Sequence, residues 1–312
     1  MQLKQSTQRT FIQFLLMASL PFIIASISTK EQIVVAAPVP IPPDTIKLSP
    51  LSYQTVQERL QEDLDSNRPI VIHVIVALCD NVNQGIVPVP KKLGNGQEPS
   101  ANLYWGAAYG VRAYMTGKGK WKRVRTDTLA DQGILERVVL KKTIKRSGKD
   151  VTTYLVAEAW DGSKIKDAMQ RFANMAAGRT PLSVQRDGSD SSSTIQAGGD
   201  AHLIAYVGHN GLMEFRLDNY PAADTTRPAR SALALACASK PYLLKVLQFG
   251  GSHPLLLTTN LMAPEAYALD AAITGFVGGK DPSAIHTNVA KAYNTYQKCG
   301  MKGARNLFSV EE

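Results

Sequence analysis

Continuous apolar runs bounded by turn residues recur along the chain. Residues 69–78, 202–208 and 231–236 are three of them. An apolar run of this length is typical of a strand that is buried on both faces, as in a parallel sheet. Further strands are predicted at 151–160 and 254–260. We therefore expect a sheet whose strands are mostly parallel.

Other segments carry apolar residues three or four positions apart, which is the spacing of an amphipathic helix. They are residues 53–67, 102–114, 161–172, 263–276 and 283–299. Asp161 is a candidate N-cap. Residues 178–199 are rich in Gly, Ser and Asp and are predicted to form an exposed loop. Strands that alternate with helices predict an α/β domain.

Two reactive side chains stand at the ends of two predicted strands. His209 follows the run at 202–208, and Cys237 follows the run at 231–236. Open parallel sheets place their chemistry just past the carboxyl ends of their strands, so both side chains are expected at one edge. An imidazole beside a thiol can take the thiol proton, and the thiolate then attacks a carbonyl carbon. The pattern indicates a cysteine hydrolase.

An apolar block ending in His, followed by an apolar block ending in Ala-Cys, resembles the caspase-like cysteine peptidases. This group includes caspases, metacaspases, legumains, gingipains and clostripain. The resemblance covers about residues 68–297, although only the His209 and Cys237 blocks are diagnostic. It implies a three-layer α/β/α sandwich in which His209 is the general base. It also implies that Cys237 is the nucleophile that hydrolyses a peptide bond through an acyl-enzyme.

One position departs from the family pattern. Family members have Gly directly after the His, whereas here Asn210 precedes Gly211. In one interpretation a one-residue bulge lets the Gly211 N–H form the oxyanion hole with the Cys237 N–H. In the other, the site is altered. The alternative to a peptidase is therefore a catalytically inactive caspase-like protein that binds a peptide or an envelope partner through the same cleft.

Polar residues in the loops after the predicted strands are candidates for substrate binding, because such loops often carry binding residues. The candidates are Asp80, Asn81, Asn83, Asn210, Lys240 and Asn260. In the resembling family, an acid in the first specificity pocket would favour Arg or Lys in the substrate, whereas Lys240 would favour an acidic side chain. The Asp and Asn residues of 80–83 are also ordinary turn formers, so both roles stay open.

The amino terminus has the layout of a secretory signal. Basic residues precede an apolar stretch at 11–27, and small residues follow it. A membrane span usually needs about 20 apolar residues, so residues 1–37 are either a cleaved signal peptide or a retained anchor. Residues 38–50 are predicted to be a proline-rich linker, and residues 51–312 the α/β domain. We expect an exported protein, periplasmic or extracellular, that meets a membrane only through such an anchor.

Composition fits a globular domain, because 44% of the 312 residues are hydrophobic and 20% are charged. The formal net charge is +9, and basic residues concentrate in 118–149. We interpret that segment as a solvated hairpin, because no nucleic-acid motif accompanies it, and we expect no nucleic-acid partner.

Metal-ligand spacings, phosphate loops and dinucleotide fingerprints are missing from the sequence, so neither a metal nor a cofactor is predicted. The expected partner of this monomer is a peptide or protein substrate.

The chain has three cysteines, Cys79, Cys237 and Cys299, which are too few for a disulfide framework. A third interpretation makes the protein a structural component of the cell envelope. In that case Cys237 and Cys299 form a bridge, and the basic hairpin contacts anionic surface polymers. This interpretation predicts no free thiol at Cys237 and an association that depends strongly on salt.

Overall fold

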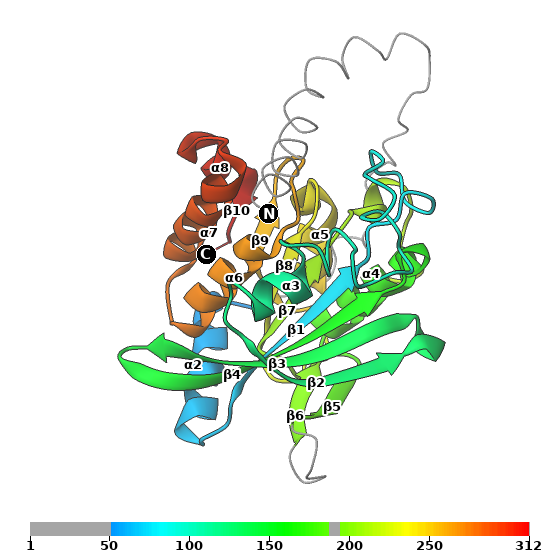
Figure 1. Ribbon diagram of the computed structural model, residues 1–312. Helices are drawn as coiled ribbons and strands as arrows, with labels where there is room; N and C mark the ends of the chain where they lie inside the picture. Colours follow the sequence, from blue (N-terminus) through cyan, green and yellow to red (C-terminus); the bar gives the residue numbers. More distant parts are fainter. Residues whose placement is uncertain (1–50, 187–193, 312) are drawn as a thin grey trace. The chain divides into compact units, whose positions relative to one another are not determined.

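The computed structural model describes residues 51–186 and 194–311. The predicted leader and linker lie outside these residues. The main sheet has eight strands. They are β1 (Ile70–Ala77), β2 (Lys122–Leu129), β3 (Ile134–Arg146), β4 (Lys149–Trp160), β7 (Leu203–Val207), β8 (Ser231–Leu235), β9 (His253–Thr258) and β10 (Phe308–Ser309). Their spatial order is β10-β9-β8-β7-β1-β4-β3-β2 (Figure 1).

Parallel pairing dominates the middle of this sheet. β1 pairs in parallel with β4 and β7, β7 with β8, and β8 with β9. The strands toward the two edges pair antiparallel, β2 with β3, β3 with β4, and β10 with β9. The chain is therefore an α/β protein with a mixed, mostly parallel sheet, which confirms the prediction from the apolar runs.

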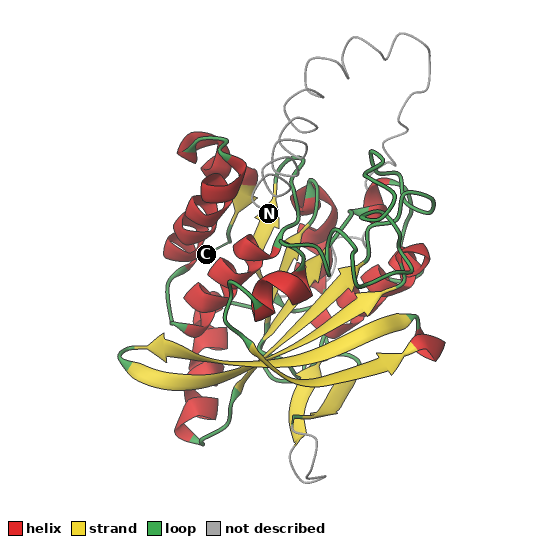
Figure 2. Ribbon diagram, viewed as in Figure 1, coloured by secondary structure: helices red, strands yellow, loops and turns green. Residues whose placement is uncertain are grey.

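Helices cover both faces of the sheet (Figure 2). The first face packs against α2 (Tyr53–Asp65), α3 (Val111–Thr116), α6 (Ala266–Val277), α7 (Pro282–Gln297) and α8 (Met301–Leu307). The second face packs against α4 (Ile165–Ala176) and α5 (Ser239–Phe249). Along β1, Ile70 and Ile72 belong to the first core and Val71 to the second. Successive side chains of a strand thus point into two different cores, and the elements stack in three layers.

The predicted helices at 53–67, 161–172, 263–276 and 283–299 are present, with bounds shifted by a few residues. Asp161 caps the first turn of its segment, the 3-10 helix Gly162–Lys164, by accepting the N–H of Ser163. Among the described residues, no helix has both the length and the apolar character that crossing a membrane requires.

The predicted helix at 102–114 is mostly wrong, because only α3 is helical and residues 102–110 form turns. The side chain of Asn102 accepts the N–H of Cys79 (3.0 Å) and donates to its carbonyl (2.8 Å). Asn102 thereby ties the start of the segment to the end of β1. At Gly106 a Cβ atom would stand 2.1 Å from the Ser100 carbonyl oxygen, a closeness that only a tight turn of backbone produces.

The predicted exposed loop at 178–199 is also wrong in part. It contains a two-stranded antiparallel sheet of β5 (Pro181–Gln185) and β6 (Thr194–Gly198). Val184 and Ile195 face each other across this hairpin and are buried in the second core. A few apolar residues among polar ones were too weak a signal for a strand in the sequence, yet they pack the hairpin onto the second core, with Ala197 and Leu182 beside this pair.

A carboxylate lies inside the second face of the sheet. Glu158 of β4 is fully buried and accepts hydrogen bonds from Arg137 (2.7 Å), Arg171 (3.1 Å) and the indole of Trp160 (3.1 Å). The Nε2 atom of His73 stands 3.4 Å from the same carboxylate. Burial alone would raise the pKa of Glu158, but the neighbouring His73 and the two arginines hold that pKa well below its ordinary value. Glu158 is therefore a buried anion with its charge compensated.

A second buried pair links α2 to β1 and β7. The Nδ1 atom of His202 accepts the N–H of Val71 (3.1 Å), and its Nε2 atom lies 2.8 Å from Asp63. Since Nδ1 accepts a hydrogen bond, the ring is neutral with its proton on Nε2. Burial lowers the pKa of His202 to about 4. Its hydrogen bond to Asp63 in turn lowers the pKa of that carboxyl.

We expect the protein to lose stability as the pH falls from about 6.5 to about 4. In this window His202 is protonated in the unfolded chain but stays neutral in the folded chain, so folding becomes less favourable. The full shift corresponds to roughly 3 kcal/mol, and buried His253, whose pKa burial also lowers, adds to the loss. Urea unfolding at several pH values should show a shallower pH dependence in His202→Gln. An unchanged pH dependence of the free energy of unfolding in this variant would refute the role of His202.

Candidate functional site

His209 and Cys237 follow two neighbouring parallel strands. In the register of β7 and β8, Val207 lies opposite Leu235. The N–H of Gly208 donates to the Leu235 carbonyl (3.2 Å). His209 and Cys237 each come two residues after this pair. The structure therefore places them at equivalent positions on the carboxyl edge of the sheet.

The imidazole of His209 is held by Glu214. Its Nε2 atom lies 2.6 Å from Oε1 of Glu214, and the other carboxylate oxygen accepts the N–H of Gly85 (3.1 Å). The hydroxyl of Tyr206 donates to the His209 carbonyl (2.7 Å) and fixes the backbone. The His209 side chain is 9% exposed and that of Glu214 39%. Because the carboxylate occupies Nε2, Nδ1 is the ring nitrogen left for proton transfer.

Glu214 was missed in the sequence because it belongs to no motif with His209. A 3-10 turn, Gly211–Met213, reverses the chain between them, and the N–H of Glu214 donates to the Gly211 carbonyl (2.9 Å). A carboxylate five residues after a candidate base was the only signal in the sequence, and it carries little weight without the turn.

Cys237 stands on a sharp turn between β8 and α5. The next residue, Ala238, has φ 46° and ψ 43°, a left-handed conformation that costs a residue with a side chain roughly 1–2 kcal/mol. Buried hydrogen bonds lock the turn: Ser239 N–H donates to Thr258 Oγ1 (3.0 Å), and Thr258 N–H donates to Ser239 Oγ (2.9 Å). Strained backbone that its surroundings enforce is frequent at functional sites.

The thiol of Cys237 is hydrogen-bonded to the backbone of Met262. Its Sγ atom accepts the Met262 N–H (3.3 Å) and donates to the Met262 carbonyl (3.5 Å). Burial raises the pKa of this thiol, and the bond from Met262 offsets the rise only in part. Within the described ranges no hydrogen bond joins His209 to Cys237. The structure brings the two residues to one edge without pairing them.

Asn210 connects the two loops. Asn210 is fully buried, and its Nδ2 atom donates to the Cys237 carbonyl (2.8 Å). Its Oδ1 atom has no hydrogen-bond partner among the residues that the structure describes. In the same part of the chain, no backbone carbonyl accepts the N–H of Gly211 or of Cys237. The extra residue after His209 therefore fastens the Cys237 turn to the His209 loop.

The candidates Asp80, Asn81 and Asn83 build their own loop. Asp80 accepts the N–H groups of Val82 (2.8 Å) and Asn83 (3.1 Å) and the side-chain amide of Asn83 (2.8 Å). Asn81 bonds both backbone groups of Val89. Burial alone would raise the pKa of Asp80, but its hydrogen bonds outweigh burial and keep that pKa below its ordinary value. Turn chemistry explains these three side chains.

The candidates Lys240 and Asn260 lie near Cys237, in α5 and in the loop after β9. The ammonium of Lys240 bonds Ser309 (2.7 Å) and Glu311 (3.0 Å) in the carboxyl-terminal segment. The Asn260 carbonyl accepts the N–H of Ala238 (2.9 Å), and its Oδ1 atom accepts the N–H of Leu261 (2.7 Å). Asn260 thus holds the Cys237 turn, whereas Lys240 ties the start of α5 to the carboxyl-terminal segment.

Exposed apolar side chains flank the candidate site, and the sequence pattern gave no sign of them. Val82, Val87 and Leu261 are the exposed large apolar residues of the described chain, at 87%, 62% and 63% exposure. The first two lie in the loop after β1, and Leu261 lies in the loop after β9. In the order β9-β8-β7-β1, these loops stand on either side of the loops that carry Cys237 and His209.

All three cysteines are unpaired in the structure. Cys79 is buried at the end of β1, and Cys299 is exposed after α7. The disulfide between Cys237 and Cys299, on which the envelope interpretation depends, is not formed. In the described ranges, no group of three or more His, Cys, Asp and Glu side chains is arranged to hold a metal ion.

Comparisons with family models, curated proteins and solved structures find no match to this chain.

Proposed function

We propose that this chain is a caspase-like cysteine hydrolase that cleaves peptide bonds through an acyl-enzyme on Cys237. The observation that supports it most is the placement of His209, backed by Glu214, and Cys237 at equivalent positions past adjacent parallel strands. A carboxylate, an imidazole and a thiol are the parts of a triad, in which the carboxylate orients the base.

The proposed reaction uses the free Nδ1 atom of His209. It takes the thiol proton, and Cys237 Sγ attacks the carbonyl carbon of the substrate. The C–N bond then breaks, and the amine leaves with the proton from Nδ1. A water molecule, deprotonated by the same nitrogen, hydrolyses the thioester and regenerates the thiol. The N–H groups of Gly211 and Cys237, which no backbone carbonyl accepts in the described ranges, are the donors proposed for the oxyanion.

The thiol has to leave Met262 before it can react. Both of its hydrogen bonds are to that residue, and burial raises its pKa, so the conformation described is a resting one. We propose that a bound peptide displaces the Met262 contact and turns Sγ toward His209. Only the thiolate is reactive, and His209 would form it only once the thiol has turned toward the imidazole. The reactivity of Cys237 would therefore depend on a peptide being bound.

The proposed substrate is an extended peptide with apolar side chains on both sides of the scissile bond. The loops after β9 and β1 are three strand spacings apart, or ~14 Å, the length of about four extended residues. A peptide laid across the four strand ends would meet Leu261 at one end and Val82 at the other. We further propose that the protein is exported and acts as a monomer.

Labelling with peptidyl acyloxymethyl ketones tests this function. We expect the wild-type full chain to be modified at Cys237 faster than glutathione reacts, with about 10²-fold slowing in His209→Ala and no labelling at position 237 in Cys237→Ala. Cys299→Ala removes an exposed thiol far from the His209 loop in sequence and serves as the matched control, which should react as wild type. Mass spectrometry would locate the adduct.

A catalytically inactive protein that binds peptides is the second candidate. The two hydrogen bonds between the Cys237 thiol and Met262 favour it, because they occupy the group that would have to react. In that case the label would appear at Cys299 alone, or at Cys237 no faster than on glutathione. Either result would reject the hydrolase and leave the peptide-binding protein as the remaining candidate.

A further inference from the structure

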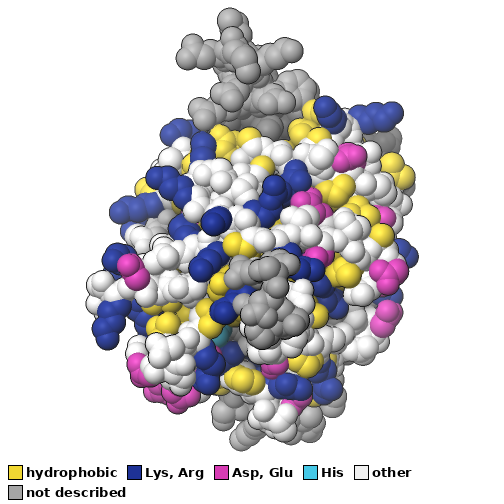
Figure 3. Space-filling view, turned by 60° about the horizontal axis from the view of Figure 1, so that its bottom comes forward, with side chains coloured by type: hydrophobic (Ala, Val, Ile, Leu, Met, Phe, Trp, Pro, Cys, Tyr) yellow, Lys and Arg dark blue, Asp and Glu magenta, His cyan; other side chains and the backbone are white. Residues whose placement is uncertain are grey.

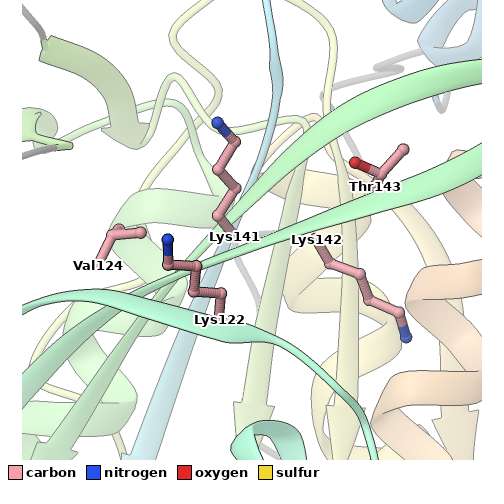
Figure 4. A pocket seen from close by; sticks show the side chains of 5 residues that line it. All are labelled: Lys122, Val124, Lys141, Lys142 and Thr143. Atoms are coloured by element: carbon pink, nitrogen blue, oxygen red, sulfur yellow. The ribbon is translucent and has the colours of Figure 1, made fainter.

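A hollow of about 310 Å³ lies between β2 and β3, outside the site described above. Its lining consists of Lys122, Val124, Lys141, Lys142 and Thr143. The side chains of Lys122 and Lys141 extend in the same direction, whereas Lys142 extends to the other side (Figure 4). Two ammonium groups therefore share one side of the hairpin.

These two lysines are direct cross-strand neighbours, since Lys122 pairs with Lys141 in the register of β2 and β3. Like charges directly opposite each other in an antiparallel pair are destabilising. Among the described residues, neither ammonium group is paired with a carboxylate. The Lys141 ammonium instead stands 5.6 Å above the ring of Tyr154.

The neighbouring acids are already occupied. Asp127, on the same strand as Lys122, is paired with Arg125 (2.7 Å). Asp270 is paired with Lys142 (3.2 Å), whose ammonium also stands 5.4 Å over the Trp121 ring. Lys and Arg side chains are spread over much of the surrounding face (Figure 3). In the described ranges, no carboxylate therefore offsets the repulsion between Lys122 and Lys141.

We propose that Lys122 and Lys141 bind a phosphate or sulfate group. A tetrahedral dianion balances two positive charges, and its oxygens accept hydrogen bonds from several directions. The Thr143 hydroxyl, which lines the same hollow, adds a neutral donor. The group belongs either to a small soluble anion or to the headgroup of an anionic lipid, and the same two lysines recognise both.

Calorimetric titration of the full chain with inorganic phosphate and with pyrophosphate tests this site. The double variant Lys122→Gln/Lys141→Gln is expected to weaken binding at least about tenfold. The control is Lys145→Gln/Lys149→Gln, which removes the same charge from exposed positions around the turn between β3 and β4. Unchanged thermal unfolding midpoints would show that both variants are folded.

Vesicles of phosphatidylglycerol and of phosphatidylcholine distinguish the two sources. Binding to the anionic vesicles that is lost in Lys122→Gln/Lys141→Gln and kept in the control identifies a lipid headgroup, and the same pattern with free pyrophosphate identifies a soluble ligand. Equal weakening in both double variants would mean unspecific charge attraction and would overturn the proposal. So would the failure of every probe to bind.

Discussion

His209→Ala is expected to slow peptide hydrolysis by about 10²–10⁴-fold, because it removes the proposed base. Glu214→Gln should act in the same direction with a smaller loss. The carboxylate holds Nε2 of His209 at 2.6 Å, which leaves Nδ1 for the thiol and stabilises the imidazolium formed during the reaction. Since Glu214 positions the base, kcat should fall while KM changes little. Turnover of a fluorogenic peptide library measures both parameters.

Two further variants separate catalysis from structure. Glu214→Asp keeps the negative charge and should recover part of the activity lost in Glu214→Gln. Asp218→Asn removes a carboxylate from the same loop, where it pairs with Lys166 on the surface, and should leave turnover unchanged. A Glu214→Gln enzyme with wild-type kcat would remove Glu214 from the mechanism, and equal losses in Asp218→Asn would point to a general disturbance of the loop.

Glu158→Ala is expected to lower the free energy of unfolding by about 3–5 kcal/mol, the largest stability change we anticipate. The substitution leaves the guanidinium of Arg137, whose side chain is only 9% exposed, without its carboxylate inside the sheet. An uncompensated buried charge is far more costly than a lost pair of exposed charges. Urea unfolding at neutral pH measures the difference.

The matched control lies on the same two strands. Asp150 pairs with Lys145 across β3 and β4 at 2.7 Å, but both side chains are more than 60% exposed, so Asp150→Ala should cost no more than about 1 kcal/mol. Glu158→Gln, which keeps the size and one acceptor oxygen, should fall between the two and remains measurable if Glu158→Ala does not fold. A loss of less than 1 kcal/mol in both Glu158 variants would contradict the proposed charge compensation.

The central strands could be predicted because burial on both faces selects apolar residues at most positions, with few polar exceptions such as His73. All eight residues of β1 are buried, and β7, β8 and β9 are buried along their whole length. By contrast, β5 and β6 are half exposed and carry few apolar residues, so their composition matches that of a loop. The turn at 102–110 escaped prediction because Asn102 acts through a contact with the distant backbone of Cys79 and Gly106 through the close approach of a tight local turn.

The site was predictable only where strand ends determine it. The positions of His209 and Cys237 follow from the lengths of two apolar runs, which the sequence displays. Their hydrogen-bond partners do not, because Glu214 depends on a 3-10 turn and Met262 on the path of the loop after β9. The polar residues after β1 are a similar case, since nothing in the sequence distinguishes a carboxylate that binds a ligand from one that folds its own loop.

The two borders of the sheet differ in how they avoid further pairing. β10 is only two residues long, whereas β2 spans eight residues, none of them buried. Irregular pairing interrupts β2 between Arg123 and Arg125 and again between Asp127 and Leu129. Charged and bulged border strands resist adding a strand from another molecule. The basic residues of β2 therefore also oppose aggregation through this edge of the sheet, whether or not an anion is bound to Lys122.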